Sequence, residues 1–479
     1  MKEKWLVLKF GGSSVRGPDQ WIAIADRIEE RRQQGYRVLL VCSAVEGITD
    51  LLHKLSCTPD DQSLIDRFVA IHQSLSASLN IDGDEWINKS RARLVQLSSE
   101  LSESLIPATV ARLMATGEWL STRLGWVFLQ KKFETEWVDS RGLLEAQPDD
   151  DASEKRQWLS ADCRPGSSHS LRTGLEGCWP VVITQGFIVG MPGGGTALLG
   201  RGGSDTSAVL LGGRIEAERV EIWTDVPGLF SADPRKIPEA RLLKRLEYSE
   251  ALEMAASGAS VVQARAVRAA AATNTPVWIR DTSRPEIGGT HINGQADHTE
   301  GAKAVVCQEG MAVLLLQNID PRQQVGFLAW VFQTIANNGI SIDLVATSET
   351  TTTLAINLAN NHIDSEDLKE LAQDLRTRCK IDLFPDCVTV NIVGRGVRRA
   401  LPKLNPAFTQ FDEKPLLMVS QSANDLCLSL LVQKGHEAAV IKAAHNALVP
   451  SLSGDALFGP SWLELENVSA GNVVVGGQG

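Results

Sequence analysis

The chain has 479 residues, 43% of them hydrophobic and 22% charged, a composition typical of a globular protein with about two to four domains. The net charge of −11 argues against a nucleic-acid partner, and no apolar run reaches the roughly 20 residues of a bilayer crossing, so we expect no membrane partner. The eight cysteines and eight histidines are scattered singly, which favours reduced thiols in a cytoplasmic protein and argues against a zinc site.

The chain begins with a strand–helix–strand pattern. Residues 5–10 and 38–43 are short apolar runs, and between them apolar residues from Trp21 to Ile28 recur at intervals of three and four. This order predicts a right-handed βαβ unit in a parallel sheet. Ligands bind at the carboxyl ends of such strands. The residues that fall there are Lys9, Gly11, Gly12 and Ser13.

The following stretch, residues 60–131, is expected to be largely helical. It holds one carboxylate, Glu118, among apolar and small residues. A charge on a helix surface is the plain interpretation of Glu118, and a buried functional acid is the alternative. Residues 181–184 form a further apolar run that predicts another buried strand.

A glycine-rich turn at residues 200–203 leads into a predicted helix. Ser204 and Asp205 are favourable residues for a helix start, where free N–H groups and the helix dipole attract anions. Arg201 adds a planar guanidinium suited to a carboxylate or a phosphate. The turn therefore predicts an anion site, although a loop that merely reverses the chain remains the alternative.

Residues 305–465 have a different pattern. A helix beginning at Gly326 precedes predicted strands at 340–345 and 351–358 and a helix at 365–377, and a weaker copy follows roughly 74 residues later. We infer two βαββαβ units in tandem. Small sheets of this kind have exposed edges that bind one another or a small ligand.

Four motifs in the first 300 residues resemble those of aspartokinases, which belong to the amino acid kinase family. They are K-F-G-G-S-S-V from Lys9, L-G-R-G-G-S-D from Leu199, W-T-D-V-P-G-L-F from Trp223 continuing to D-P-R at Asp233, and the G-E-x-x-S-T match around Glu118. The first two also resemble the kinase half of fusions to diaminopimelate decarboxylase. Gly326–Leu328 and Thr347–Glu349 are similar to the first ACT domain of the lysine-sensitive class.

The resemblance implies a three-layer amino acid kinase fold with a mainly parallel central sheet over residues 1–300. Two ACT domains of ferredoxin-like βαββαβ topology would follow at 301–386 and 387–465, with a flexible tail at 466–479. ACT domains pair between chains, so a homodimer is expected.

The implied reaction moves the γ-phosphoryl of ATP to the β-carboxylate of L-aspartate and gives 4-phospho-L-aspartate, with Mg²⁺ bound alongside the nucleotide. A free carboxylate has a pKa of about 3.9 and is already an ionised nucleophile, so no general base is required. Catalysis then consists of positioning and charge stabilisation. The resemblance assigns these tasks to Lys9 and Asp205.

The resemblance also implies which residues bind each substrate. Arg201 would hold the α-carboxylate of aspartate and Glu118 its ammonium group. The aspartate pocket would be lined by Thr49, Glu118, Phe187, Arg201 and Ser204. The ATP side would comprise Lys9, Gly11, Gly12, Ser13, Thr224, Asp225, Phe230, Asp233, Arg235 and Ser260, with Phe230 in place of the usual tyrosine.

One position departs from the family pattern. The family has G-A-K-V-L-H-P where this chain has Gly258-Ala259-Ser260, and the lysine expected at Ser260 contacts the phosphates. One lost donor in such a site costs about 2.7–4 kcal/mol of transition-state stabilisation, and Arg265 is a candidate substitute. The alternative function is therefore a catalytically weakened paralogue that senses an amino acid as a regulatory subunit. A kinase for another amino acid is a third candidate, which the pair Glu118 and Arg201 disfavours.

The regulatory half matches positions that bind lysine in similar enzymes. They are Gly326, Phe327, Leu328, Ser341, Asp343, Thr347 and Ser348. Asp343 could meet the ammonium group of a ligand, and the backbone around Gly326 its carboxylate. L-Lysine is therefore the expected effector, and a dimer interface without a ligand is the alternative.

Overall fold

The computed structural model describes residues 4–149, 152–259, 261–295, 299–318, 325–361, 363–411, 415–449 and 456–467. The chain divides into two compact units. The first unit takes in Met1–Leu229, Lys244–Leu252 and Val261–Ala296, and the second takes in Phe230–Leu243, Glu253–Ser260 and Asp297–Gly479. The predicted tail lies outside the described residues from position 468, and so does Ser260. The domain limits stay a prediction.

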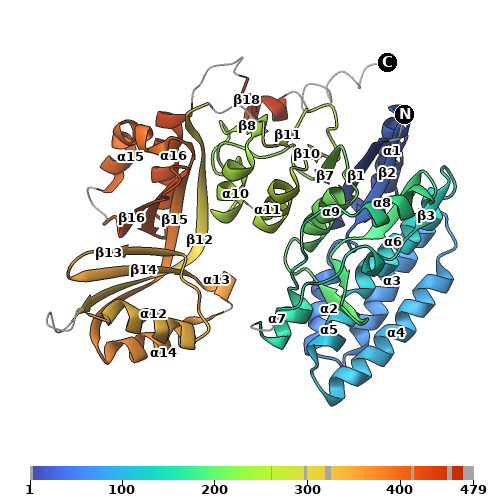
Figure 1. Cartoon of the computed structure of the whole chain (residues 1–479), viewed down its shortest axis with the longest axis horizontal. Helices are drawn as coiled ribbons and strands as arrows, with labels where there is room; N and C mark the ends of the chain where they lie inside the picture. Colours follow the sequence, from blue (N-terminus) through green and yellow to red (C-terminus); the bar gives the residue numbers. More distant parts are fainter. Residues whose placement is uncertain are drawn as a thin grey trace. The chain divides into compact units, whose positions relative to one another are not determined.

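The first unit is built on an eight-stranded sheet with the order β3-β4-β2-β1-β7-β10-β11-β9 (Figure 1). Its first six strands run parallel to their neighbours, and β11 is antiparallel to β10. The mainly parallel central sheet is thus confirmed. The strands are β1 (Lys4–Phe10), β2 (Tyr36–Cys42), β3 (Thr135–Trp137), β4 (Val181–Gln185), β7 (Arg219–Thr224), β9 (Arg245–Leu246), β10 (Val277–Asp281) and β11 (Thr290–Ile292).

Successive residues of a strand point to opposite sides of the sheet, so a strand that is apolar throughout gives the sheet two apolar faces. Helices cover both of these faces. Leu8 and Phe10 of β1 belong to the core shared with α1 and α6. On the other face, a Cβ at Gly212 of α9 would lie 2.5 Å from Val220 of β7. The helices are α1 (Pro18–Gln33), α2 (Ile48–Cys57), α3 (Gln62–Ser78), α4 (Asp84–Glu103), α5 (Pro107–Met114), α6 (Thr116–Leu129), α7 (Glu154–Leu159), α8 (His169–Glu176), α9 (Gly203–Arg214), α10 (Tyr248–Ala256) and α11 (Ala264–Thr273).

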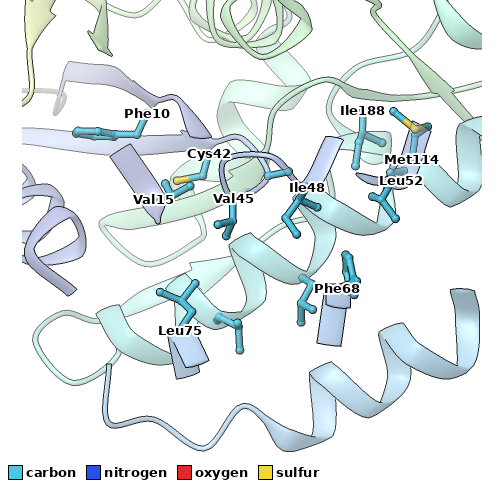
Figure 2. Packing of buried hydrophobic residues seen from close by; sticks show 14 of the residues in the cluster. Phe10, Val15, Cys42, Val45, Ile48, Leu52, Phe68, Leu75, Met114 and Ile188 are labelled. Atoms are coloured by element: carbon cyan, nitrogen blue, oxygen red, sulfur yellow. The ribbon is translucent and has the colours of Figure 1, made fainter. Parts of the chain in front are cut away.

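An extensive apolar core lies on the face of α1 and α6. Close packing is most evident at Gly125, where a Cβ would come within 1.9 Å of the Trp21 ring, so a larger residue would displace α6 from α1. Figure 2 shows how side chains from β1, β2 and the helices that follow meet in this core. Those labelled are Phe10, Val15, Cys42, Val45, Ile48, Leu52, Phe68, Leu75, Met114 and Ile188.

A buried ion pair ties α1 to β7. Glu221 is fully buried and accepts two parallel hydrogen bonds from the guanidinium of Arg31, Nε to Oε1 at 3.0 Å and Nη2 to Oε2 at 3.1 Å. Arg219 lies 2.7 Å from the same carboxylate, and the indole N–H of Trp223 donates to it. The carboxylate therefore depends on these donors to offset its loss of hydration.

We predict that Arg31→Leu destabilises the protein by about 3 kcal/mol, at the low end of the range for a broken buried pair because Arg219 remains. Unfolding by urea measures the effect. Arg91→Leu, which removes an exposed pair with Asp66, is the control and should change the free energy of unfolding by less than about 1 kcal/mol. Equal effects of the two substitutions would contradict the role of the buried pair.

The second unit contains a six-stranded antiparallel sheet of order β13-β14-β12-β15-β17-β16. Its strands are β12 (Gly301–Asn318), β13 (Leu344–Thr347), β14 (Thr351–Asn357), β15 (Cys379–Arg395), β16 (Met418–Gln421) and β17 (Cys427–Gln433). The helices are α12 (Phe327–Asn337), α13 (Leu358–Asn361), α14 (Ser365–Arg376), α15 (Asn405–Phe408) and α16 (Glu437–Leu448). None of the helices in the described residues combines the length and hydropathy that crossing a membrane requires.

Two βαββαβ motifs share this sheet, but they are interleaved and not strictly in tandem. The first motif uses the end of β12, and then α12, β13, β14, α14 and the start of β15. The second uses the rest of β15, β16, β17 and α16, and it takes its fourth strand from residues 301–308 of β12. Because β12 has 18 residues, it is long enough to serve both motifs. The predicted strand at 340–345 is displaced, since the Ser341 N–H bonds to the Asn361 side chain instead of a strand.

Candidate functional site

The candidate site of the first unit lies where β4, β2, β1, β7 and β10 end, at one edge of the parallel sheet. The loop after β1 touches the loop after β2, since Glu46 N–H donates to the Gly12 carbonyl. A Cβ at Gly12 would lie 3.0 Å from the Ala44 carbonyl oxygen, so a larger residue would push these loops apart. The predicted residues Gly11, Gly12 and Ser13 lie in this loop.

Lys9 and Asp205 form an ion pair in this region. Lys9 precedes the last residue of β1 and points to the α9 face, and Asp205 lies in the first turn of α9. The Nζ–Oδ1 distance is 2.5 Å, and the two side chains are only 10% and 12% exposed. The fold thus places a buried cation beside a helix N-terminus, a combination that stabilises anions. The roles of both residues stay a prediction.

The glycine-rich turn before α9 requires its glycines. Gly202 has a φ of +62°, and a Cβ there would come within 1.8 Å of Gln263. A Cβ at Gly203 would lie 2.5 Å from the Phe187 ring. Arg201 is exposed and makes no ion pair within the described residues, so its guanidinium can meet a solute. Ser204 follows, half-buried, in the first turn of α9.

Phe187 has a left-handed backbone conformation that is rare for an aromatic residue, with a φ of 67°. Its N–H donates to Ser207 Oγ at 2.8 Å, and its carbonyl accepts the Leu199 N–H at 2.9 Å. The loop after β4 is therefore fixed to α9 through Ser207 and to the chain just before the glycine-rich turn through Leu199. Strain of this kind is characteristic of functional sites. The sequence pattern placed Ser207 in the helix after the glycine-rich turn but gave it no role in the site.

Glu118 is buried in the first turn of α6, so the interpretation as a surface charge is wrong. Burial raises the pKa of this carboxyl to about 7, against the opposing effect of backbone N–H groups of Glu118 and Ala44. Its Oε2 has no hydrogen-bond partner among the described groups. Gly117 lets α6 approach this closely, because a Cβ there would lie 3.0 Å from Ala44 and Ile48. An unsatisfied buried acid of this kind suits a cationic ligand group.

Thr49, the other residue predicted to line this pocket from the helical part of the unit, is exposed on the neighbouring α2.

The ends of β7 and β10 are joined by a hydroxyl network. The Thr224 carbonyl accepts the N–H of Thr282 at 2.8 Å and its hydroxyl at 3.0 Å, and Thr282 Oγ1 also lies 3.1 Å from Ser14 Oγ. The Thr224 hydroxyl donates to the exposed Asp225. Thr282 follows the predicted strand that ends at Asp281, so the strand-end rule could have identified it.

Three residues predicted on the ATP side, Phe230, Asp233 and Arg235, belong to the second unit. Burial tends to raise the pKa of Asp233, but hydrogen bonds from Arg235 hold it below its usual value. These bonds join Nε to Oδ1 at 3.0 Å and Nη2 to Oδ2 at 2.9 Å. Phe230 is buried and packs edge-on against Trp462, with ring centroids 5.6 Å apart.

Arg265, the candidate substitute for the missing lysine, binds backbone carbonyl groups of the protein. Its guanidinium donates to the carbonyls of Leu199 and Ala161, both at 2.6 Å, and it also contacts Asp162. These bonds fix the backbone immediately before the glycine-rich turn. Arg265 is therefore occupied by protein groups, and a structural role accounts for it.

The predicted effector residues lie around the start of α12 and along β13 in the second unit. Gly326 caps α12 with a φ of +86°, and the Asp343 carboxylate accepts the Asn357 N–H at 2.7 Å. Of the seven residues, Phe327 is half-buried and the other six are exposed. The exposed residues are Gly326, Leu328, Ser341, Asp343, Thr347 and Ser348.

We predict that Glu118→Gln gains stability relative to the wild type as the pH rises from 5 to 8. The folded pKa of about 7 exceeds the ordinary value of 4.5, so the folded wild type binds more protons in this window and loses stability as the pH rises. The expected gain at pH 8 over pH 5 is about 2.5 kcal/mol, measured by urea unfolding. A difference between the two proteins that is the same at both pH values would contradict the buried acid.

Comparison with known proteins gives consistent matches. Residues 4–281 match the amino acid kinase family. The chain is 28% identical to the lysine-sensitive aspartokinase 3 of Escherichia coli over 92% of this chain and 99% of that protein. The crystal structure of E. coli aspartokinase III with aspartate and ADP, in the R-state, superposes with a TM-score of 0.79 at 27% identity, covering 93% of this chain and 100% of that one.

The T-state structure of the same E. coli enzyme, in complex with lysine and aspartate, matches with a TM-score of 0.74 at 27% identity, over 93% of this chain and 99% of that chain. The family match extends from β1 to the end of β10 and covers more than half of the sequence. This chain therefore belongs to the amino acid kinase family.

Proposed function

We infer that this chain is an aspartate kinase, which transfers the γ-phosphoryl of ATP to the β-carboxylate of L-aspartate and gives 4-phospho-L-aspartate. The observation that carries this inference is the buried ion pair of Lys9 and Asp205 at the N-terminus of α9, at the carboxyl edge of a parallel sheet. The E. coli enzyme crystallised with aspartate and ADP resembles this chain over nearly its whole length.

In this proposal the reaction needs no general base. The β-carboxylate of aspartate is ionised at neutral pH and attacks the γ-phosphorus directly. The protein holds the two substrates and stabilises the negative charge of the transferring phosphoryl group. Lys9 and the N–H groups at the start of α9 supply this stabilisation, and Asp205 orients the Lys9 ammonium group.

The proposal has the protein recognise both the α-carboxylate and the α-ammonium group of aspartate. Arg201 binds the α-carboxylate through its exposed guanidinium, and Glu118 binds the ammonium through the oxygen that lacks a partner. An ammonium beside Glu118 favours the ionised carboxyl and lowers its pKa, so substrate binding removes the penalty of its burial. The remaining residues of the proposed pocket are Thr49, Phe187 and Ser204.

The proposal assigns the nucleotide to residues that follow strand ends and to residues from 230 to 260. Mg²⁺ is proposed to bind together with ATP, held mostly by phosphate oxygens and water. The proposed contacts are Lys9, Gly11, Gly12, Ser13, Thr224, Asp225, Phe230, Asp233, Arg235 and Ser260.

Inhibition by an amino acid, proposed to be L-lysine, would act through the first ACT motif of a homodimer. The proposed effector residues are exposed in the single chain. One of them, Leu328, is apolar and 38% exposed, and two further apolar side chains near them in the sequence are exposed, Val325 at 100% and Val345 at 41%. Such a surface favours association with a second copy, which would cover both the apolar side chains and the ligand.

The activity is tested by ADP release from MgATP with and without L-aspartate. We expect aspartate-dependent turnover, and we expect Lys9→Met to lower kcat by about 10²–10³ because one charge-stabilising donor is lost. Lys4→Met is the matched control on the same strand, since Lys4 is exposed and paired with Glu218, and it should leave kcat unchanged. Absence of aspartate-dependent turnover at high enzyme concentration would refute the proposal.

The second candidate, a weakened paralogue that acts as a regulatory subunit, is favoured by Ser260. We predict that Ser260→Lys raises kcat by roughly tenfold to a hundredfold, because it restores a cation expected to contact the phosphates. The same assay measures this effect. Lysine binding by calorimetry without turnover in either protein would identify a sensor and not a kinase.

A further inference from the structure

The segment from Phe230 to Leu243, here called the nucleotide segment, is built into the second unit. Its last residues form β8 (Arg241–Leu243), which pairs with β18 (Phe458–Ser461). Lys236 Nζ lies 2.7 Å from Glu309 Oε1 of β12. The segment that carries Phe230, Asp233 and Arg235 is thus attached to β12 and β18, which belong to the predicted regulatory half of the chain.

Ser231 is the most constrained residue of the nucleotide segment. It is fully buried, and its carbonyl accepts the Val305 N–H of β12 at 2.7 Å. Its N–H donates to the Arg241 carbonyl at 2.9 Å, and its Oγ accepts the Arg241 N–H at 2.8 Å. The same Oγ lies 2.9 Å from Nε2 of His445. Every polar group of Ser231 therefore has a defined partner inside the second unit.

His445 is the side-chain partner in this arrangement. It lies on α16 and is 3% exposed. Burial lowers the pKa of the imidazole, so the ring is neutral near pH 7 and makes a hydrogen bond with a hydroxyl in either tautomer. The proposed reaction uses neither His445 nor Ser231. A buried polar pair without a chemical task nevertheless fixes the backbone that it joins.

We propose that Ser231 and His445 are a positioning pair that fixes the nucleotide segment and thereby sets the affinity for nucleotide without affecting that for aspartate. The inference rests on the proposed function, which assigns Phe230, Asp233 and Arg235 to ATP. Neither Ser231 nor His445 touches a substrate. They act through the backbone, because Ser231 adjoins Phe230, whose ring position depends on the course of the chain at this point.

The test is titration calorimetry with MgADP and, separately, with L-aspartate, so that it does not depend on turnover. We expect His445→Ala to weaken MgADP binding by about tenfold and aspartate binding by less than about twofold. His445→Gln keeps a side-chain donor near Ser231 and should restore MgADP affinity to within about threefold of the wild type. Ser231→Ala, a smaller change, should reproduce the selective loss if His445→Ala does not fold.

His72→Ala is the matched control. His72 is a fully buried histidine of the first unit with one hydrogen bond, from Nδ1 to the Phe68 carbonyl at 2.8 Å. It should lower stability without a selective loss of MgADP affinity. Unchanged MgADP binding in both His445→Ala and Ser231→Ala, or an equal loss for both ligands, would overturn the positioning pair. A wild type that binds MgADP without aspartate-dependent turnover would refute the kinase activity alone.

Discussion

The buried ion pair between Lys9 and Asp205 is the interaction on which the candidate site depends. Removing two charges from water is unfavourable, and only close contact and fixed dipoles offset that cost. The contact arises because β1 and α9 meet at the carboxyl edge of the sheet, with a distance of 2.5 Å between Nζ and Oδ1. Glycines at positions 12, 202 and 203 allow the surrounding loops to approach one another closely.

Glu118 illustrates the opposite balance. Its carboxyl is buried with one oxygen unsatisfied, and burial raises its pKa, so ionisation of this group opposes folding. A cationic ligand group next to this carboxylate would offset the cost of its desolvation, and the free energy gained would contribute to binding. In the proposed function, Glu118 and the exposed Arg201 would together bind a ligand with a positive and a negative end.

The second unit contains both the proposed effector residues and the nucleotide segment, which lie far apart in the sequence. Its antiparallel sheet carries the proposed effector residues, and β12 and α16 hold the nucleotide segment through Val305 and His445. A change in the packing of this sheet would therefore alter the position of Ser231 within the same unit. If the proposed assignments hold, this arrangement links regulation to the nucleotide through buried hydrogen bonds, which tolerate little displacement.

The sequence by itself determined the βαβ start, the mainly parallel sheet, the helical stretch at 60–131 and the glycine-rich turn into α9. These features rest on local periodicity and on contiguous motifs, which survive without knowledge of long-range contacts. The tertiary structure alone decided that Glu118 is buried, that Arg265 is occupied, and that residues 301–308 complete the second βαββαβ motif. It also joined Ser231 to His445, 214 positions apart. Partners so distant are chosen by the packing of whole elements, and no local pattern encodes that packing.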